Sequence, residues 1–165
     1  MDAEAAFAGF VAGSYAALVR TAYLLTGDRG HAEDLVQQCL LTTYRAWPRL
    51  DSLDAAGAYT RTSMVRLATR WGARRWRGEV PTYDLPEHGA DDHAGAVDSA
   101  VLVRRALGAL PAQQRAVLVL RYLEDRSEAE VAAIMGCSVG TVKSRASRAL
   151  AALRAHGLLV EADHG

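Results

Sequence analysis

Apolar residues recur every three or four positions along nearly the whole chain, which is the spacing that lines one face of an α-helix. The first such stretch covers about residues 4–25 and the second runs from about 28 to 47. No segment alternates apolar and polar residues with the period of two that a half-buried strand requires. The pattern therefore predicts an all-α fold.

Breaking and capping residues divide this pattern into separate helices. Gly27 and Asp28 separate the first two helices, and Pro48 ends the second. A third helix is predicted over about residues 54–76. Beyond residue 96 we expect four more, over about 97–107, 111–123, 128–135 and 139–153, with Pro111 in a first turn, where its missing N–H costs nothing.

A change of composition separates the third helix from the last four. Residues 78–96 contain Pro81, Pro86, Gly89 and Gly95 among acids and histidines. This composition predicts an exposed, flexible linker. We therefore expect two small helical domains, residues 1–77 and 97–157, that move independently about the linker 78–96.

Two histidines of this linker lie near two acids, but their spacing matches no known metal-ligand pattern. The histidines are His88 and His93, and the acids are Asp91 and Asp92. A solvated linker explains them better than a metal site. We expect no metal, no other cofactor and no catalytic residue, since the chain also has no Gly-rich phosphate loop and no nucleophile motif.

The formal net charge is zero, yet the charges are segregated along the chain. Residues 55–78 hold six arginines and no acid, residues 79–98 hold six acids and no Lys or Arg, and residues 137–155 hold four cations and no acid. Basic stripes on helices suit a polyanion such as DNA. The alternative is that each run is a solvated helix face balanced by acids elsewhere.

The N-terminal sequence and the placement of the cysteines favour a cytoplasmic protein. The N-terminus opens with acids and alanines, unlike a signal peptide, and we expect no membrane-spanning run. The two cysteines, Cys39 and Cys137, lie far apart, and Cys39 falls on an apolar helical face. This is typical of reduced thiols and not of a disulfide framework.

The stretch from Glu128 to Ser147 has the spacing of a DNA-binding helix-turn-helix. Ser127 and Glu130 form a capping box, Gly136 supplies the left-handed turn residue, and Ser138 caps the second helix. Val142 is predicted to pack inward. The outward residues would be Lys143, Ser144, Arg145, Ser147 and Arg148, which could reach base edges and phosphates in a major groove.

Two stretches resemble the ECF group of sigma factors, and a subgroup of actinobacterial type in particular. The first is LVRTAYLLTGDRGHAEDLVQQCLLTTYRAW, residues 18–47, whose AEDLVQ is similar to sigma region 2. The second, residues 107–153, is similar to region 4 and contains the specific VGTVKSR; WRGEVPT at residues 76–82 fits the subgroup. The resemblance implies a protein that binds core RNA polymerase and directs it to promoters.

The resemblance also implies roles for single residues. Asp34, Leu35 and Gln37 would bind the clamp helices of the polymerase's largest subunit, while the region 4 part would meet the flap of the second-largest subunit. The −10 element would be bound by the third helix, through Arg61, Arg66, Arg70, Arg74, Arg75 and Arg77. The −35 element would be read by Lys143, Ser144, Ser147 and Arg148, with Arg115 and Arg145 at the DNA backbone. An anti-sigma factor is left open as a further partner.

This sequence departs from the family pattern at two positions. Gln38 stands where the family usually has an acid, which would weaken one polar contact with the polymerase. Arg66 stands where the family often has an asparagine that holds a flipped promoter base. An arginine cannot reproduce the paired donor and acceptor of an amide, but it can stack on a base or bind phosphate.

Two other classes of protein compete with this interpretation. A stand-alone helix-turn-helix regulator would leave AEDLVQ and the arginine-rich helix unexplained, and it commonly needs a dimer to read two half-sites. An enzyme would need a pair of converging groups, but the adjacent acids Glu33 and Asp34 point in different directions on a helix. Co-elution with core polymerase would separate the sigma factor from the regulator.

Overall fold

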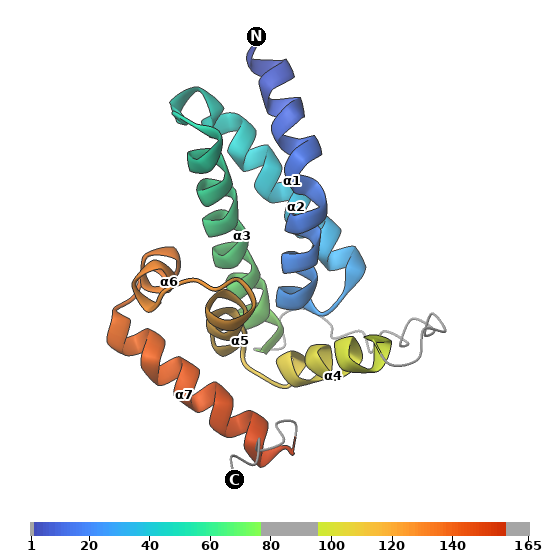
Figure 1. Ribbon diagram of the computed structural model, residues 1–165, viewed down its shortest axis with the longest axis vertical. Coiled ribbons are helices and arrows are strands. Elements are labelled where there is room, and N and C mark those ends of the chain that lie inside the picture. Colours follow the sequence, from blue (N-terminus) through green and yellow to red (C-terminus); the bar gives the residue numbers. More distant parts are fainter. Residues whose placement is uncertain (1, 77–95, 158–165) are drawn as a thin grey trace.

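The computed structural model describes residues 2–76 and 96–157, and every regular element among these residues is helical. Figure 1 shows three long helices, α1 to α3, above a second group formed by α4 to α7. The prediction of an all-α fold is confirmed. The elements are α1 Ala3–Thr26, α2 Arg29–Ala46, the 3-10 turn η1 Trp47–Arg49, α3 Leu53–Trp76, α4 Ala96–Gly108, α5 Ala112–Leu118, the π-helical turn η2 Val119–Leu123, α6 Glu128–Met135 and α7 Val139–Ala155.

The first two helices begin where carboxylates satisfy their free N–H groups. The Asp2 carboxylate accepts from the N–H of Ala5 at 2.7 Å, and the Asp28 carboxylate accepts from His31 at 2.8 Å. Gly27 has φ 75°, a left-handed conformation that suits glycine. The predicted Asp28 cap is confirmed, and the turn at Gly27 lets α2 fold back along α1 (Figure 1).

The core of the three-helix group is apolar except for one pair of hydroxyls. Thr43 on α2 and Thr60 on α3 are completely buried, and their hydroxyl oxygens lie 2.8 Å apart. Each also lies 2.8 Å from a carbonyl oxygen of its own helix. Because a shift of either helix would separate two buried hydroxyls, the pair favours one register of α2 against α3.

The buried thiol of Cys39 allows a test of this core. Burial raises the pKa of Cys39 to about 11, against a smaller lowering by the charge of Arg70. At pH 8 only about one such thiol in a thousand is a thiolate, the form that reacts. In the folded protein we expect a thiol reagent to label the half-buried Cys137 at least about 100-fold faster than Cys39. Mass spectrometry of the labelled protein measures both rates, and equal rates would contradict this packing.

Four aromatic rings join the start of α1 to the end of α2. The ring centroid of Phe7 lies 4.9 Å from that of Tyr44 and 5.2 Å from that of Trp47, both edge-to-face. The Phe10 ring lies 5.5 Å from Trp47. Such pairs contribute about 0.5–1.5 kcal/mol beyond the area that they bury, so the cluster anchors the N-terminal turns of α1.

The second group differs from the sequence-based prediction in one element. The sequence predicts one helix from Pro111 to Leu123, but α5 ends at Leu118 and η2 continues as a wider π turn. There the N–H of Glu124 donates to the carbonyl of Val119 at 3.0 Å. Pro111 is the N-cap, one position earlier than predicted. A single π turn hardly changes which side chains share a face, so periodicity could not reveal it.

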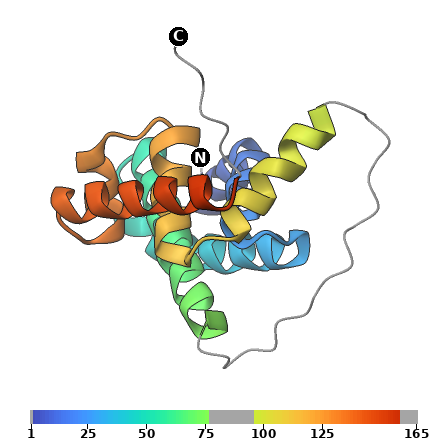
Figure 2. The ribbon, with the colours of Figure 1, turned by 90° about the horizontal axis from the view of Figure 1, so that it is seen from below.

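The two groups of helices pack against each other. Helix α3 contacts α5 and α6, and α1 contacts α4, α5 and η2 (Figure 1). Seen from below, α7 lies across the side nearest the viewer, and the first group lies behind it (Figure 2). The two predicted helical units are therefore in contact in this structure, and their independent movement stays a prediction. The predicted linker 78–96 lies outside the described residues, except for Ala96, which begins α4.

Helix α1 is long and apolar enough to cross a membrane by length and composition alone. The sequence analysis expects no such run, so the finding corrects it. In the structure α1 packs along α2 and α3 as one of the three helices of the first group. Only 17% of its apolar window is buried in this packing.

Candidate nucleic-acid interface

Helices α6 and α7 are joined by a turn whose residues are fixed by local bonding. The Ser127 hydroxyl accepts from the N–H of Glu130 at 3.1 Å at the start of α6, and Ser138 caps α7 in the same way at 3.1 Å. Gly136 ends α6 with φ 67°. Hydrogen bonds with Ser127 and Arg126 lower the pKa of the Glu130 carboxyl. The predicted capping box, turn glycine and second cap are confirmed.

Four polar side chains of α7 lie on one exposed face, which we call the α7 face. Its members are all solvent-exposed: Lys143, Ser144, Ser147 and Arg148. On the other side of the helix, Val142 and Ala149 are completely buried. The α7 face thus offers two cations and two hydroxyls in one direction, a set that can donate to guanine acceptors and to phosphates.

Lys143 already has a partner within the chain. Its Nζ lies 3.9 Å from a carboxylate oxygen of Glu128, in the first turn of α6. The Lys143 side chain is two-thirds exposed, so this ion pair contributes little to stability. The ion pair keeps the Lys143 side chain close to α6, and a stronger anion can replace Glu128 as its partner.

Arg145 does not lie on the outward face where the sequence analysis placed it. It is half-buried, and its guanidinium donates to the Sγ of Cys137 at 3.8 Å. The contact spans the turn between α6 and α7. Arg145 therefore contacts the turn in this structure, and its expected contact with the DNA backbone stays a prediction.

Arg115 is half-buried and is also engaged within the protein. Its guanidinium donates to three main-chain carbonyls, those of Leu25 at 2.7 Å, Leu107 at 2.8 Å and Leu110 at 3.0 Å. Leu25 belongs to α1, so this side chain joins the two groups of helices. The expected contact of Arg115 with the phosphate backbone is not available in this arrangement.

The arginines of α3 divide into two kinds. Arg70 and Arg74 are exposed along the helix, whereas Arg61 and Arg66 face the second group. Arg61 is half-buried, with its Nε 3.3 Å from Glu124, and burial lowers its pKa against the opposing effect of Glu124. The side chain of Arg75 and all of Arg77 lie outside the described residues. The structure therefore describes the side chains of four of the six predicted arginines on α3. Two of these, Arg61 and Arg66, contact residues of the second group.

The residues predicted to bind polymerase lie on α2, but one of them is internal. Asp34 and Gln37 are exposed, while Leu35 is completely buried and cannot offer its side chain. Sequence reasoning missed Leu41 and Tyr44, which are 51% and 47% exposed. Leu41 lies four residues after Gln37 and Tyr44 three residues after Leu41, and this helical spacing is the signal that could have found them. We call Asp34, Gln37, Leu41 and Tyr44 the α2 face.

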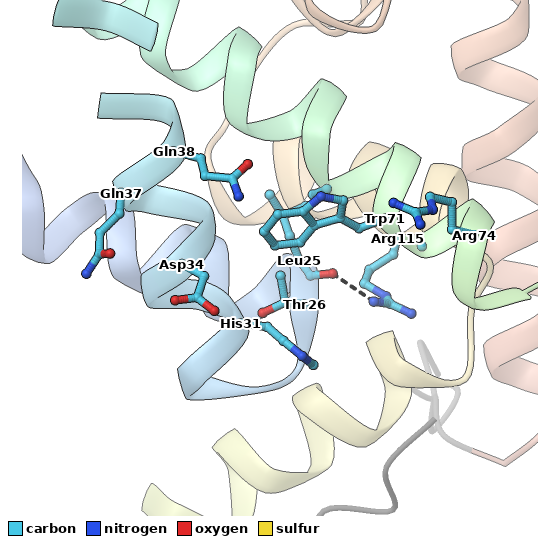
Figure 3. Close-up of a pocket in the computed structure, with 11 residues that line it drawn as sticks. Leu25, Thr26, His31, Asp34, Gln37, Gln38, Trp71, Arg74 and Arg115 are labelled. Atoms are coloured by element: carbon cyan, nitrogen blue, oxygen red, sulfur yellow. Dashed lines mark hydrogen bonds between the residues drawn. The ribbon is translucent and has the colours of Figure 1, made fainter. Parts of the chain in front are cut away.

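A cavity of about 380 Å³ lies beside the α2 face, where both groups of helices meet. Figure 3 shows the Trp71 ring between Gln38 on one side and Arg115 on the other, with the Arg115 bond to the Leu25 carbonyl dashed. The wall includes Asp34, His31 and Arg74. In residues 2–76 and 96–157, this cavity included, no group of three His, Cys, Asp or Glu is placed to hold a metal ion. The His88 and His93 pair lies outside the described residues.

Each of the two groups of helices matches a family model. "Sigma-70 region 2" matches residues 10–78, and "Sigma-70, region 4" matches residues 100–153. The RNA polymerase sigma-E factor of Streptomyces coelicolor is 42% identical over 138 residues, covering 84% of this chain and 78% of that protein. The ECF RNA polymerase sigma factor SigL of Mycobacterium tuberculosis is 34% identical over 161 residues, covering 92% of this chain and 89% of that one.

Two solved structures have the same architecture. The sigma factor RpoE from Bartonella quintana, in complex with the anti-sigma factor NepR, matches with a TM-score of 0.73 and 28% identity over 96% of this chain and 98% of that chain. CnrH, in complex with the cytosolic domain of CnrY, matches with a TM-score of 0.58 and 26% identity over 93% and 88%.

The geometry and the comparisons agree on one assignment. A capped helix-turn-helix with a basic outer face lies in the part that matches region 4, and the arginine-rich α3 lies in the part that matches region 2. Relatives more than 30% identical over most of the chain exclude both a stand-alone regulator and an enzyme. The chain belongs to the ECF group of the sigma-70 family and is a sigma factor that directs transcription initiation by RNA polymerase.

Proposed function

We propose that residues 1–77 bind core polymerase and the −10 element, and that residues 97–157 bind the −35 element. The observation that carries this division is the α7 face, which presents Lys143, Ser144, Ser147 and Arg148 on one side of a helix anchored by Val142. A recognition helix needs this separation of an outward polar face from a buried anchor. The flap of the polymerase's second-largest subunit would contact the same residues 97–157 away from the α7 face.

The α7 face reads the −35 element through the major groove. Arg148 and Lys143 donate to the O6 and N7 acceptors of guanine, and the two serines contact a base or a phosphate. Lys143 leaves Glu128 to do so; the two atoms lie 3.9 Å apart, and the Lys143 side chain is 66% exposed.

The −10 element meets α3, where phosphates and unpaired bases are the partners. Arg70 and Arg74 are exposed one helical turn apart, and guanidinium groups both bind phosphate and stack on bases. Arg66 takes the place of a base-binding asparagine by the same means, so the −10 preference of this protein differs from that of relatives with the asparagine.

The α2 face binds the clamp helices of the largest subunit. It combines a carboxylate, an amide and two large apolar side chains within three turns. Exposed apolar residues beside polar ones are typical of the centre and rim of a protein interface. Leu35 supports this face from beneath by fixing α2 on the core.

A further protein could hold this sigma factor inactive. RpoE and CnrH were solved in complex with NepR and with the cytosolic domain of CnrY. We propose that this chain also has an anti-sigma partner and that it acts in the cytoplasm, where polymerase and promoters are found.

Transcription with purified components tests the function. Core polymerase from a Streptomyces species, this chain and genomic DNA should together give transcripts whose 5′ ends share two upstream elements. Omitting either protein should remove them. If the chain binds DNA by itself and never joins the polymerase, the proposal fails.

The role of α3 leads to a salt-dependence prediction. Replacing Arg70 and Arg74 by alanine in the holoenzyme should lower the slope of log affinity against log salt by about one to two units, since each phosphate contact contributes about 0.9. Promoters of different sequence should be affected alike. Arg49→Ala, in η1 and off α3, is the control, and an unchanged slope in the double variant would place the DNA elsewhere.

A further inference from the structure

We propose that Glu128, in the first turn of α6, determines how strictly the chain selects guanine in the −35 element, because it competes with DNA for the Lys143 side chain. Glu128 touches no base itself and acts through Lys143, so it is a positioning residue. The inference rests on the proposed role of the α7 face in the major groove. Figure 1 shows α6 beside the end of α7 at which that helix begins.

One carboxylate oxygen of Glu128 is turned toward α7 and covered by the protein. Its Oε2 lies 3.9 Å from the Nζ of Lys143, and no group of the described residues donates a hydrogen bond to it. Among these residues Lys143 is also the one cation within 4 Å of the carboxylate. A covered carboxylate oxygen without a hydrogen bond is unfavourable unless a positive charge lies close to it. Lys143 supplies that charge.

The stability of α6 does not account for this orientation. An acid in the first turn of a helix is favourable because the N-terminal end of a helix is positive. Glu130 already meets that need from an exposed position, where it also pairs with Arg126 at 3.4 Å. Glu128 could act in the same way with its carboxylate in water. Its Oε2 instead lies against α7, which points to a role at Lys143.

The packing of α6 on α7 fixes the two residues relative to each other. Val131, one turn after Glu128, and Val142, directly before Lys143, are both completely buried. A hollow of about 350 Å³ lies beside the pair, and Ser147 of the α7 face also lines it. The hollow gives the flexible lysine side chain room to move between the carboxylate and a base edge in the groove.

Competition between Glu128 and DNA makes Lys143 selective. A lysine paired with an acid adds little net charge, so a base pair with weak acceptors leaves it in place. The O6 and N7 acceptors of guanine can take it from the carboxylate. Without the acid, the same lysine would bind any nearby phosphate regardless of sequence. Glu128 therefore lowers affinity for every −35 sequence, and lowers it least where a guanine lies opposite Lys143.

Glu128→Gln tests this role, because glutamine keeps the shape of the side chain and removes its charge. In the holoenzyme the variant should bind randomised −35 DNA about two- to fivefold more tightly, the range expected for loss of an exposed ion pair. Its preference for guanine at one position should fall by a similar factor. The slope of log affinity against log salt should steepen by about 0.9, since Lys143 gains a phosphate. Competition binding at several salt concentrations measures all three.

Glu130→Gln is the matched control. It removes the same charge from the same turn of α6, but the partner of Glu130 is Arg126 and not Lys143. Its base profile and salt slope should equal those of the wild type. If Glu130→Gln relaxes the guanine preference as Glu128→Gln does, the charge of α6 and not the Lys143 contact explains the effect, and the inference is overturned.

A double-mutant cycle separates positioning from a structural role. With Lys143→Ala in place, Glu128→Gln should leave the base profile unchanged, because the residue through which it acts is gone. A packing defect would alter the profile in both backgrounds, and that result overturns the inference. An increase in affinity without any change in the guanine preference also overturns it, since general repulsion between Glu128 and phosphates would then be the whole effect.

Failure of the inference can be distinguished from failure of the proposed function. If Lys143→Ala changes the −35 base profile but Glu128→Gln does not, the role of Glu128 is overturned and the α7 face still reads the −35 element. If neither Lys143→Ala nor Arg148→Ala changes the profile, the proposed role of the α7 face fails, and the inference about Glu128 fails with it.

Discussion

Asp34→Arg should abolish binding to core RNA polymerase while leaving the chain folded. Asp34 is exposed on α2 beside Gln37, so the substitution removes nothing from the core. Reversing a charge inside an interface that was complementary to the acid costs about 2–5 kcal/mol, or about 30- to 5000-fold in affinity. Co-purification with tagged core polymerase measures the loss, and circular dichroism measures the helical content.

The control for this variant is Asp51→Arg, which makes the same change at an exposed residue between η1 and α3. It should bind polymerase like the wild type. If both variants bind fully, the α2 face is not the polymerase surface, and if both lose binding, net charge and not position explains the effect.

Arg148→Ala should cost the holoenzyme about 1–3 kcal/mol on its preferred −35 sequence and relax its preference at one base pair. Arg148 lies on the α7 face, and a bidentate contact with guanine contributes this much to discrimination. Competition binding on a library randomised across the −35 element measures both affinity and base profile.

Arg154→Ala is the matched control for that experiment. Six residues further along α7, Arg154 is displaced by about 9 Å and rotated by about 240° from Arg148. Its loss should leave the base profile unchanged. An altered profile for Arg154→Ala together with an unaltered one for Arg148→Ala would show that another face of α7 enters the groove.

Local chemistry explains why most helix ends could be predicted from the sequence. Asp28, Ser127 and Ser138 cap the helices that they were expected to cap, and Gly136 has the expected positive φ. A cap depends on a side chain and an N–H two or three residues away, so a short stretch of sequence contains all that is needed. The inward position of Val142 followed from helical spacing in the same way.

The site was predicted less completely because residue type does not determine which side of a helix faces a partner. Leu35 was assigned to the polymerase surface although it also belongs to the apolar stripe of α2, and the structure resolves that conflict by burying it. Arg115 was assigned to DNA, yet its donors are used by carbonyls that lie up to 90 residues away. Nothing in the local sequence identifies such acceptors.

The packing between the two groups of helices was not predicted from the sequence, for a related reason. Periodicity detects large apolar residues, but Gly72 and Ala112 also approach closely, and several of the joining contacts are polar. The Thr21 and Glu124 side chains that meet are 103 residues apart. Small and polar residues of this kind are equally typical of solvent-exposed surfaces.

The aromatic cluster at the start of α1 has a consequence for the α2 face. Phe7 lies edge-to-face against Tyr44, so the ring that a partner would meet already packs against a neighbour before the partner arrives. Binding then loses less conformational entropy at Tyr44 than it would at a freely rotating side chain. In the proposed interface the first turns of the chain contribute to affinity through order and not through contact. We therefore expect a deletion of residues 1–10 to weaken polymerase binding without removing any residue of the α2 face.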